Sequence, residues 1–311
     1  MPRFLSAPVR IRVPATSANL GPGFDAFGLA LRVYDEVTAR VTGRGVAIRI
    51  SGEGAGELPT DESHLVVRAM LATFDRIGVE PPAGIELTCT NAIPQARGLG
   101  SSSAAIVAGI LAARALVEGG AGMLDDPAAL RLASEIEGHP DNVAPCLLGG
   151  FTIAWLEPDG ARAVRLAPAD AVHPIVLVPT QRGLTTQARA ALPATVPHAD
   201  AARNAGRAAL LVHALTTDPG LLLPATEDRL HQGYRAPAAP ATYALVSELR
   251  TAGIPAVVSG AGPSVLVFGP AEIPVTAGWQ LLDVGVDARG ALVEVDSQHA
   301  ERGPVAAGRA S

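Results

Sequence analysis

The chain has 311 residues, of which 48% are hydrophobic and 17% charged, and all 24 of its Lys+Arg positions are arginine. The absence of lysine excludes a Walker A phosphate loop and every enzyme that forms a Schiff base through a lysine amine. A formal net charge of −6, with no arginine cluster, does not fit a protein that binds nucleic acid along a basic surface.

The length and apolar content predict one large or two medium-sized domains with real cores. The N-terminal residues lack the apolar run of a signal peptide. The longest uncharged stretches, 98–113 and 254–271, contain too many glycines, serines and prolines to span a membrane. Cys89 and Cys146 fit neither a disulfide framework nor a zinc site. We therefore expect a cytoplasmic protein with small-molecule substrates, without nucleic-acid or membrane partners, and leave a homodimer open.

In the first half of the chain, alternating valine and isoleucine predict strands at 9–13, 46–50 and 85–88. Apolar residues three and four positions apart predict a helix between Ser63 and Gly78. Two further helices are expected at 101–117 and 127–137. A strand at 150–156 and a hairpin turn at 158–160 follow.

After about residue 161 the order of elements changes. A strand at 175–178 precedes helices at 201–216 and 242–252, which are followed by strands at 256–259 and 265–268. This order predicts an α+β arrangement. We place residues 1–165 in an N-terminal domain and residues 166–296 in a C-terminal domain. The polar, Gly/Ala-rich residues 297–311 are expected to fray.

The segment most informative about chemistry is a loop of glycine and serine at the start of a predicted helix. It runs Pro94-Gln95-Ala96-Arg97-Gly98-Leu99-Gly100-Ser101-Ser102-Ser103-Ala104. Glycines let backbone amides approach an anion, and a helix start offers unpaired N–H groups at the positive end of its dipole. Taken alone, the segment fits an ordinary helix N-cap equally well. It is neither a Rossmann fingerprint, since Ser103 replaces the third glycine, nor a GxSxG nucleophile elbow.

The loop resembles the phosphate loop of the GHMP kinases, which bind ATP without a Walker lysine. Residues 13–25, VPATSANLGPGFD, resemble the N-terminal substrate motif of that family, and residues 258–265, VSGAGPSV, resemble its C-terminal glycine motif. Each alone is typical of a polar turn or a tight loop, but three matches in order extend over nearly the whole chain. EIEGHPDNVAP at 135–145, followed by LGGF at 148–151, resembles the branch of the family that phosphorylates homoserine.

The resemblance implies a two-domain α+β fold: the GHMP kinase fold, with a left-handed βαβ unit in the N-terminal domain and a ferredoxin-like α+β C-terminal domain. It also implies transfer of the γ-phosphoryl group of ATP to the side-chain hydroxyl of L-homoserine. The product would be O-phospho-L-homoserine, on the way to threonine. Two alternatives stay open, namely an isoprenoid alcohol kinase on the same scaffold and a non-catalytic GHMP-like binding protein.

The same resemblance assigns the nucleotide end of the site. Residues 94–104 would bind ATP. Ser102 and Glu135 would hold Mg²⁺, because a hydroxyl and one carboxylate suit its hydrated oxygen shell. Glu137 is the less favoured ligand, because two glutamates two positions apart on a helix cannot both face one ion. Arg97 and Arg182 are candidates for cationic help to the transferring phosphoryl group.

The resemblance assigns the substrate end to residues from both halves of the chain. Asn19 would contact the reactive hydroxyl, and Asp25, with His139 and Asp141 as further candidates, would contact the ammonium group. Arg189 and Arg235 would bind the carboxylate, since a guanidinium fork matches two carboxylate oxygens.

Gly260, in the glycine motif, completes the substrate-binding set. Asn142 stands near the place where some relatives carry a basic aspartate, and we count it with Asn19 and Glu135 among the catalytic candidates. An amide cannot accept the hydroxyl proton. We therefore expect positioning and charge neutralisation to provide most of the acceleration, with late loss of the proton to phosphate or water.

Overall fold

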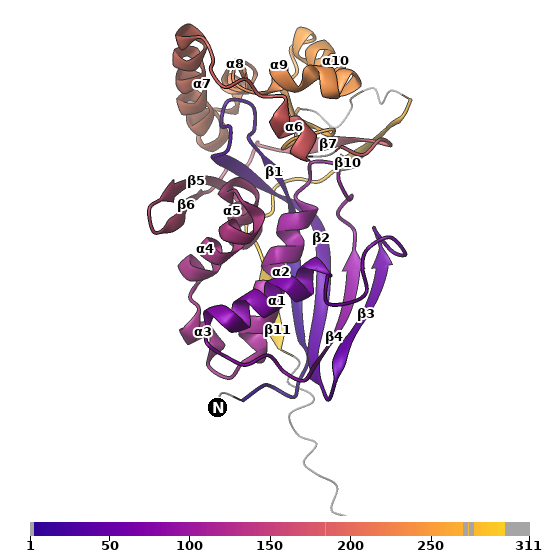
Figure 1. The fold of residues 1–311 in the computed structure, drawn as a ribbon. Helices are drawn as coiled ribbons and strands as arrows, with labels where there is room; N and C mark the ends of the chain where they lie inside the picture. Colours follow the sequence, from indigo (N-terminus) through magenta and orange to yellow (C-terminus); the bar gives the residue numbers. More distant parts are fainter. Residues whose placement is uncertain (1–2, 184, 270–272, 274–276, 296–311) are drawn as a thin grey trace, which may run out of the picture.

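The computed structural model describes residues 3–183, 185–269, 273 and 277–295 (Figure 1). Residues 297–311, which we expected to fray, lie outside these ranges. The described residues form two sheets with helices packed on them, which confirms the mixed α+β class. None of the described helices combines the length and the apolar character that crossing a membrane requires.

The larger sheet has seven strands within the described residues, in the order β11-β1-β2-β4-β3, with β5 pairing β2 and β6 pairing β5. Its strands are β1 (Val9–Ala18), β2 (Phe27–Thr42), β3 (Gly45–Gly52), β4 (Gly84–Asn91), β5 (Phe151–Glu157), β6 (Gly160–Leu166) and β11 (Leu292–Val295). Val9, Ile11 and Val13 of β1 are fully buried, whereas Arg10 between them is exposed, as the alternation predicts. β3 and β4 run parallel and are connected through a helix, while the other pairs are antiparallel.

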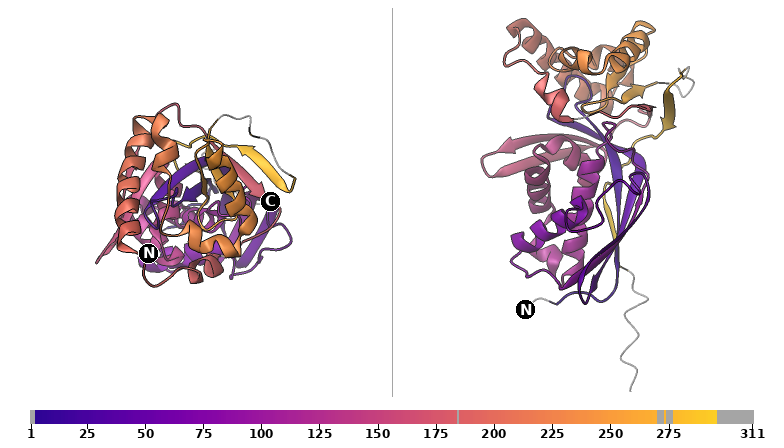
Figure 2. Two further views of the ribbon diagram at one scale, coloured as in Figure 1. Left: turned by 90° about the horizontal axis from the view of Figure 1, so that it is seen from above. Right: turned by 45° about the vertical axis from the view of Figure 1, so that its right-hand side comes forward.

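Helices cover one face of this sheet (Figure 2). They are α1 (Leu65–Arg76), α2 (Ser101–Leu116), α3 (Gly120–Met123), α4 (Asp126–Glu137) and α5 (Pro140–Leu148). α2 is the central helix of the layer and packs against α1, α4 and the sheet. Its sequence SSSAAIVAGILAARAL is small and apolar on nearly every side, which suits a helix surrounded by other elements.

The second sheet has, within the described ranges, four antiparallel strands in the order β10-β7-β9-β8. They are β7 (Pro174–Pro179), β8 (Ala256–Val258), β9 (Val265–Phe268) and β10 (Trp279–Asp283). The helices of this part are α6 (Thr185–Ala190), α7 (His198–Thr216), α8 (Leu222–Ala225), α9 (Gln232–Arg235) and α10 (Pro240–Thr251), with short 3₁₀ turns η1 (Pro219–Leu221) and η2 (Ala236–Ala238). This layer lies at one end of the long strands β1 and β2 (Figure 1).

The chain returns to the first sheet at its C-terminal end. β11 pairs antiparallel with β1, with Val9 opposite Val295 and Arg12 opposite Leu292. The larger sheet therefore takes strands from residues 9–166 and from 292–295. The assignment of residues 1–165 and 166–296 to two domains stays a prediction.

The contact between α1 and α2 depends on a glycine. A Cβ atom at Gly109 would lie 2.4 Å from the carbonyl oxygen of Val66 and 2.7 Å from the Cβ of Ala69. Both of those residues are buried on α1. The two helices therefore approach to a distance that only glycine permits at this crossing.

We predict that Gly109→Ala lowers the free energy of unfolding by about 1 to 2 kcal/mol, because overpacking at the crossing outweighs alanine's helix propensity. Gly206→Ala is the matched control: Gly206 lies within α7, exposed, and a methyl group added there would meet no other atom within 4 Å. This control should raise stability by up to about 1 kcal/mol. Denaturant unfolding of both variants measures the two effects, and a stabilising Gly109→Ala would contradict the tight crossing.

Candidate active site

A cavity of about 680 Å³ opens where the helix layer of the first sheet meets the second half of the chain. Its lining includes most of the residues that the sequence singled out. They are Asn19, Asp25, Gln95, Ala96, Arg97, Gly98, Leu99, Gly100, Ser101, Ser102, Ala104, His139, Asp141, Asn142, Arg189, Arg235 and Gly260. The three motifs, distant in sequence, therefore meet around one space.

The glycine-serine loop follows β4 and ends at the first turn of α2. Ala96, Gly98 and Gly100 have φ angles of 54°, 73° and 70°, in the left-handed region that favours glycine. No side chain caps the start of α2 at Gly100, so the capping hydroxyl or carboxylate of an ordinary N-cap is missing here. The first N–H groups of α2 are thus left for another acceptor, which is the arrangement that binds phosphate.

Contacts to the other two motifs fix this loop. A Cβ at Gly98 would lie 2.3 Å from the carbonyl oxygen of Ser259, and the hydroxyl of Ser259 donates to the carbonyl oxygen of Gly98 at 2.7 Å. The same hydroxyl contacts that of Ser17 at 2.9 Å. The amide of Thr16 donates to the carbonyl oxygen of Leu99 at 3.0 Å. One hydrogen-bonded junction therefore joins residues 13–25, 94–104 and 258–265.

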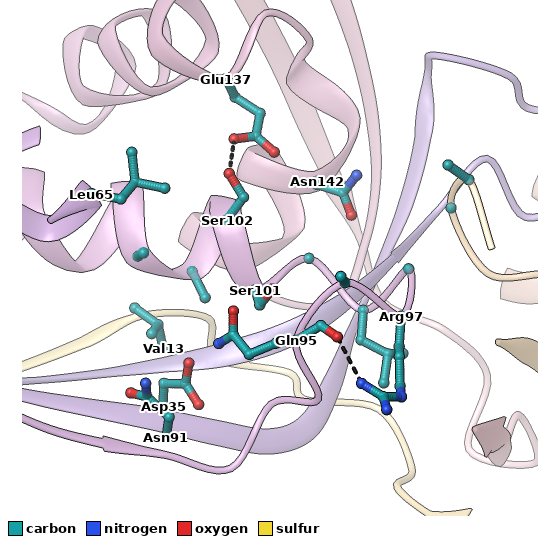
Figure 3. Close-up of a pocket in the computed structure, with 18 of the residues that line it drawn as sticks. Val13, Asp35, Leu65, Asn91, Gln95, Arg97, Ser101, Ser102, Glu137 and Asn142 are labelled. Carbon is teal, nitrogen blue, oxygen red and sulfur yellow. Dashed lines mark hydrogen bonds between the residues drawn. The ribbon is translucent and has the colours of Figure 1, made fainter. Parts of the chain in front are cut away.

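The carboxylate beside Ser102 belongs to Glu137 and not, as expected, to Glu135. The hydroxyl of Ser102 donates to one carboxylate oxygen of Glu137 at 2.7 Å (Figure 3), and that of Ser103 donates to the other at 2.9 Å. Glu135 pairs with Arg76, its side chain is 53% exposed, and it does not line the cavity. Residues two apart on a helix point about 200° apart, so only one of the two glutamates can face the loop.

Asn142 lies next to the phosphate loop at the start of α5. Its Oδ1 accepts a hydrogen bond from the hydroxyl of Thr16 at 2.8 Å. Thr16 also contacts the loop, because a Cβ at Gly100 would lie 2.0 Å from its Oγ1. Asn142 is thereby oriented by the N-terminal motif. Its side-chain amide is too weak a base to accept a proton from a hydroxyl group.

Asn19 and Asp25 occupy a left-handed loop after β1. Asn19 has a φ of 69° and Asp25 a φ of 56°. The Nδ2 of Asn19 donates to the carbonyl oxygen of Gly260 at 2.9 Å, and its Oδ1 accepts from the amide of Asp25 at 2.9 Å. Asn19 therefore fixes the loop that presents Asp25, and it retains one N–H toward a ligand.

Asp25 and Arg189 pair with each other across the cavity. Nη2 and Nη1 of Arg189 donate to Oδ1 and Oδ2 of Asp25 at 2.9 and 3.1 Å. Both side chains are partly exposed, at 36% and 48%, so the pair is weakly held. A ligand that carries both an ammonium and a carboxylate group can replace each partner of this pair.

Arg235 is more deeply placed. It is 7% exposed, its Nε donates to the carbonyl oxygen of Ala188 at 3.1 Å, and its Nη1 lies 3.2 Å from Nδ1 of His231. The ring of Phe24 lies 5.2 Å from its guanidinium carbon. Burial lowers the pKa of His231, which keeps this imidazole neutral as an acceptor for Arg235. Arg235 is thus a rigid cation, in contrast to the exposed Arg189.

His139 and Asp141 form a pair at the start of α5. Nδ1 of His139 lies 2.6 Å from Oδ1 of Asp141, which is buried. The hydrogen bond with Asp141 raises the pKa of His139. Asp141 therefore orients the imidazole ring through Nδ1, and Nε2 of His139 is left for a ligand.

The two arginines considered as cationic helpers are engaged within the chain. The guanidinium of Arg97 donates to the carbonyl oxygens of Gln95, Pro179 and Thr180, each at 2.9 Å. Figure 3 shows the bond to Gln95. Arg182 forms an ion pair with Glu57. Arg97 thus ties the phosphate loop to β7 through three hydrogen bonds. The pair of Arg182 with Glu57 is exposed on both sides and is as weakly held as that of Arg189 with Asp25.

Sequence reasoning missed one half of the cavity. An apolar wall comes from the segment before α1 and from α1 and α2: Leu58, Pro59, Leu65, Val66, Ala105 and Ala108. His64 caps α1, with its Nδ1 accepting from the amide of Val66 at 3.3 Å. Asp35, in the middle of β2, also lines this half. These residues form no motif, and Asp35 does not stand out in the sequence of β2, which also contains Arg32, Glu36 and Arg40.

Comparison with known proteins agrees with this geometry. Residues 64–150 match the GHMP kinases N terminal domain. Homoserine kinases of Streptomyces avermitilis and Streptomyces coelicolor are 60% and 59% identical to the chain, each over 94% of it and over 97% and 96% of the relative. The crystal structure of homoserine kinase from Cytophaga hutchinsonii superimposes with a TM-score of 0.76 at 26% identity, covering 94% of this chain and 99% of that one. The chain therefore belongs to the homoserine kinase family of the GHMP kinases.

Proposed function

We propose that this protein transfers the γ-phosphoryl group of ATP to the side-chain hydroxyl of L-homoserine, giving O-phospho-L-homoserine on the way to threonine. The observation that carries the proposal is the cavity itself, which joins an uncapped helix N-terminus to a cluster of opposite charges. The 60% identity to a homoserine kinase over nearly the whole chain supports the same reaction.

The nucleotide end suits a nucleoside triphosphate. The loop of residues 94–104 and the first turn of α2 offer backbone N–H groups to the phosphates. The neighbouring wall of Leu58, Pro59, Leu65 and Val66 offers an apolar surface for the base. Because the chain has no lysine, backbone amides and a metal ion have to replace the lysine of a Walker loop.

The residues beside the loop fit Mg²⁺. Ser102 and Glu137 offer hydroxyl and carboxylate oxygens within 2.7 Å of each other at the cavity wall. Among the described residues no three His, Cys, Asp or Glu side chains gather as a metal cluster. This fits Mg²⁺, which keeps several waters and takes phosphate oxygens as ligands. When bound, the ion neutralises charge on the β- and γ-phosphates.

The other end of the cavity suits a small zwitterion. Arg235 and Arg189 supply guanidinium groups for a carboxylate, and Asp25 supplies a carboxylate for an ammonium group. An isoprenoid alcohol kinase would need apolar side chains here. The charges therefore favour an amino-acid acceptor over mevalonate-type alcohols.

No basic carboxylate is required by the proposed mechanism. Asn142 is oriented by Thr16 and Asn19 by Gly260, so both amides can position the acceptor hydroxyl without accepting its proton. Alignment of the two substrates and neutralisation of phosphate charge then provide the acceleration. The hydroxyl proton leaves late, to a phosphate oxygen or water.

ATP and free amino acids are both solutes of the cytoplasm, and we place the reaction there as part of the proposal. The substrates are small molecules. A homodimer and the absence of nucleic-acid partners stay predictions from the sequence.

A coupled ADP-release assay with homoserine, mevalonate and galactose tests the proposed function. We expect turnover with homoserine alone, abolished by removal of Mg²⁺ with a chelator. Turnover with mevalonate and not with homoserine would favour the alcohol kinase. A folded protein that releases ADP with none of the three acceptors would favour a binding or regulatory role.

The assignment of Glu137 is tested by a pair of isosteric variants. Glu137→Gln should lower kcat by roughly a hundredfold or more, because the proposed metal site at Ser102 and Glu137 loses its negative charge. Glu135→Gln, the matched control on the same helix, should leave kcat within about twofold, since it loses only an exposed ion pair. Steady-state kinetics at saturating homoserine measures both. The opposite ranking would return the metal to Glu135.

A further inference from the structure

The nucleotide half of the cavity contains a buried carboxylate for which the proposed function has no role. Asp35 on β2 is 6% exposed and lines the cavity. Its Oδ1 accepts hydrogen bonds from the amides of Ala92 at 2.7 Å and Ile93 at 2.9 Å. Within the part of the chain that the structure describes, its Oδ2 has no hydrogen-bond partner, and this oxygen is accessible from the cavity.

Anchoring of the loop alone does not explain a charged residue at this position. Ala92 and Ile93 directly precede the phosphate loop, so the two hydrogen bonds fix its entry. An asparagine oxygen would accept the same two bonds without a buried charge. Burial raises the pKa of Asp35 to about 6, and none of the described arginines pairs with it. The second oxygen therefore lacks the donor that would offset its burial.

The surroundings of Asp35 indicate which ligand could supply that donor. Figure 3 shows Asp35 with Val13 and Asn91 on the strand side of the cavity, while Gln95 and Leu65 lie across from them. The same cavity continues to Ser101 at the start of α2. A nucleotide with its phosphates at α2 extends its nucleoside into the space that Asp35 faces.

We propose that Oδ2 of Asp35 accepts a hydrogen bond from an N–H or O–H donor of the bound nucleoside, either the 6-amino group of adenine or a ribose hydroxyl. Oδ1 meanwhile holds the phosphate loop, so one carboxylate contacts both the loop and the ligand. Asp35 is thereby a specificity determinant for the nucleotide. The inference rests on the proposed binding of ATP in this cavity.

The test compares ATP, ITP, 2′-deoxy-ATP and 3′-deoxy-ATP with the wild type and with Asp35→Asn. The asparagine keeps an oxygen for Ala92 and Ile93 and replaces the free acceptor by an N–H donor. We expect the KM for ATP to rise roughly ten- to hundredfold, with kcat within about threefold and the KM for homoserine unchanged. Glu36→Gln is the matched control, because Glu36 is the next residue of β2 and pairs with Arg10 away from the cavity.

The four nucleotides distinguish the two donors. If the adenine amino group is the donor, the wild type prefers ATP over ITP, in which a carbonyl replaces that group, and Asp35→Asn removes or reverses the preference. If a ribose hydroxyl is the donor, the wild type discriminates against one deoxynucleotide and the variant loses that discrimination, while the ATP to ITP ratio stays unchanged.

Two results would overturn the proposal. One is a wild-type protein that uses all four nucleotides equally, which requires no variant and is independent of whether Asp35→Asn folds. The other is an equal rise in KM for every nucleotide in the variant, which is the result of a purely structural anchor. Titration of the wild type with the same four nucleotides, without homoserine, separates this inference from the proposed acceptor, because nucleotide preference is measurable even if homoserine is not the substrate.

Discussion

The shape of the phosphate loop depends on its hydrogen-bonded contact with the C-terminal glycine motif. Gly98 lies so close to Ser259 that no side chain fits, and its carbonyl oxygen accepts from the Ser259 hydroxyl. On the other side, Thr16 donates to the next carbonyl, that of Leu99. Contacts within the protein therefore hold the loop in the left-handed form that exposes the N–H groups of α2. Preorganisation of this kind lowers the conformational cost of binding an anion.

The same junction explains how the site works in a chain without lysine. Arg97, the cation nearest to the phosphates in sequence, donates to backbone carbonyls of the loop and of β7. Its charge stabilises the loop, and under the proposed function the backbone amides of α2 and an ion held by Ser102 and Glu137 would neutralise the phosphates. At the opposite end of the cavity the arginines are placed differently. Arg235 is buried and rigid, whereas Arg189 forms a partly exposed ion pair with Asp25 that a ligand could replace.

Much of this arrangement could be predicted from the sequence, because strong periodicity and rare motifs carry the information. The predicted strands of both halves correspond to β1, β3, β4, β5, β7, β8 and β9, and the predicted helices to α1, α2, α4, α7 and α10. β2 was not predicted; both faces of residues 27–31 are buried, which removes the alternation there, although Val37 and Ala39 do alternate with Thr38 and Arg40 further along the strand. To choose between Glu135 and Glu137, one needs to know which face of α4 points toward the loop. To recognise Asp35, one needs to know that β2 lies beside the loop. Neither fact is contained in a linear sequence pattern.

The most direct test of the central claim is the affinity of a nonhydrolysable ATP analogue for Ser259→Ala, measured by isothermal titration. We predict binding roughly three- to tenfold weaker than in the wild type, because the loop loses the bond that holds Gly98. Ser264→Ala is the control in the same motif, since its buried hydroxyl has no hydrogen-bond partner among the described residues and its affinity should not change. Unchanged affinity in a folded Ser259→Ala protein would contradict the account.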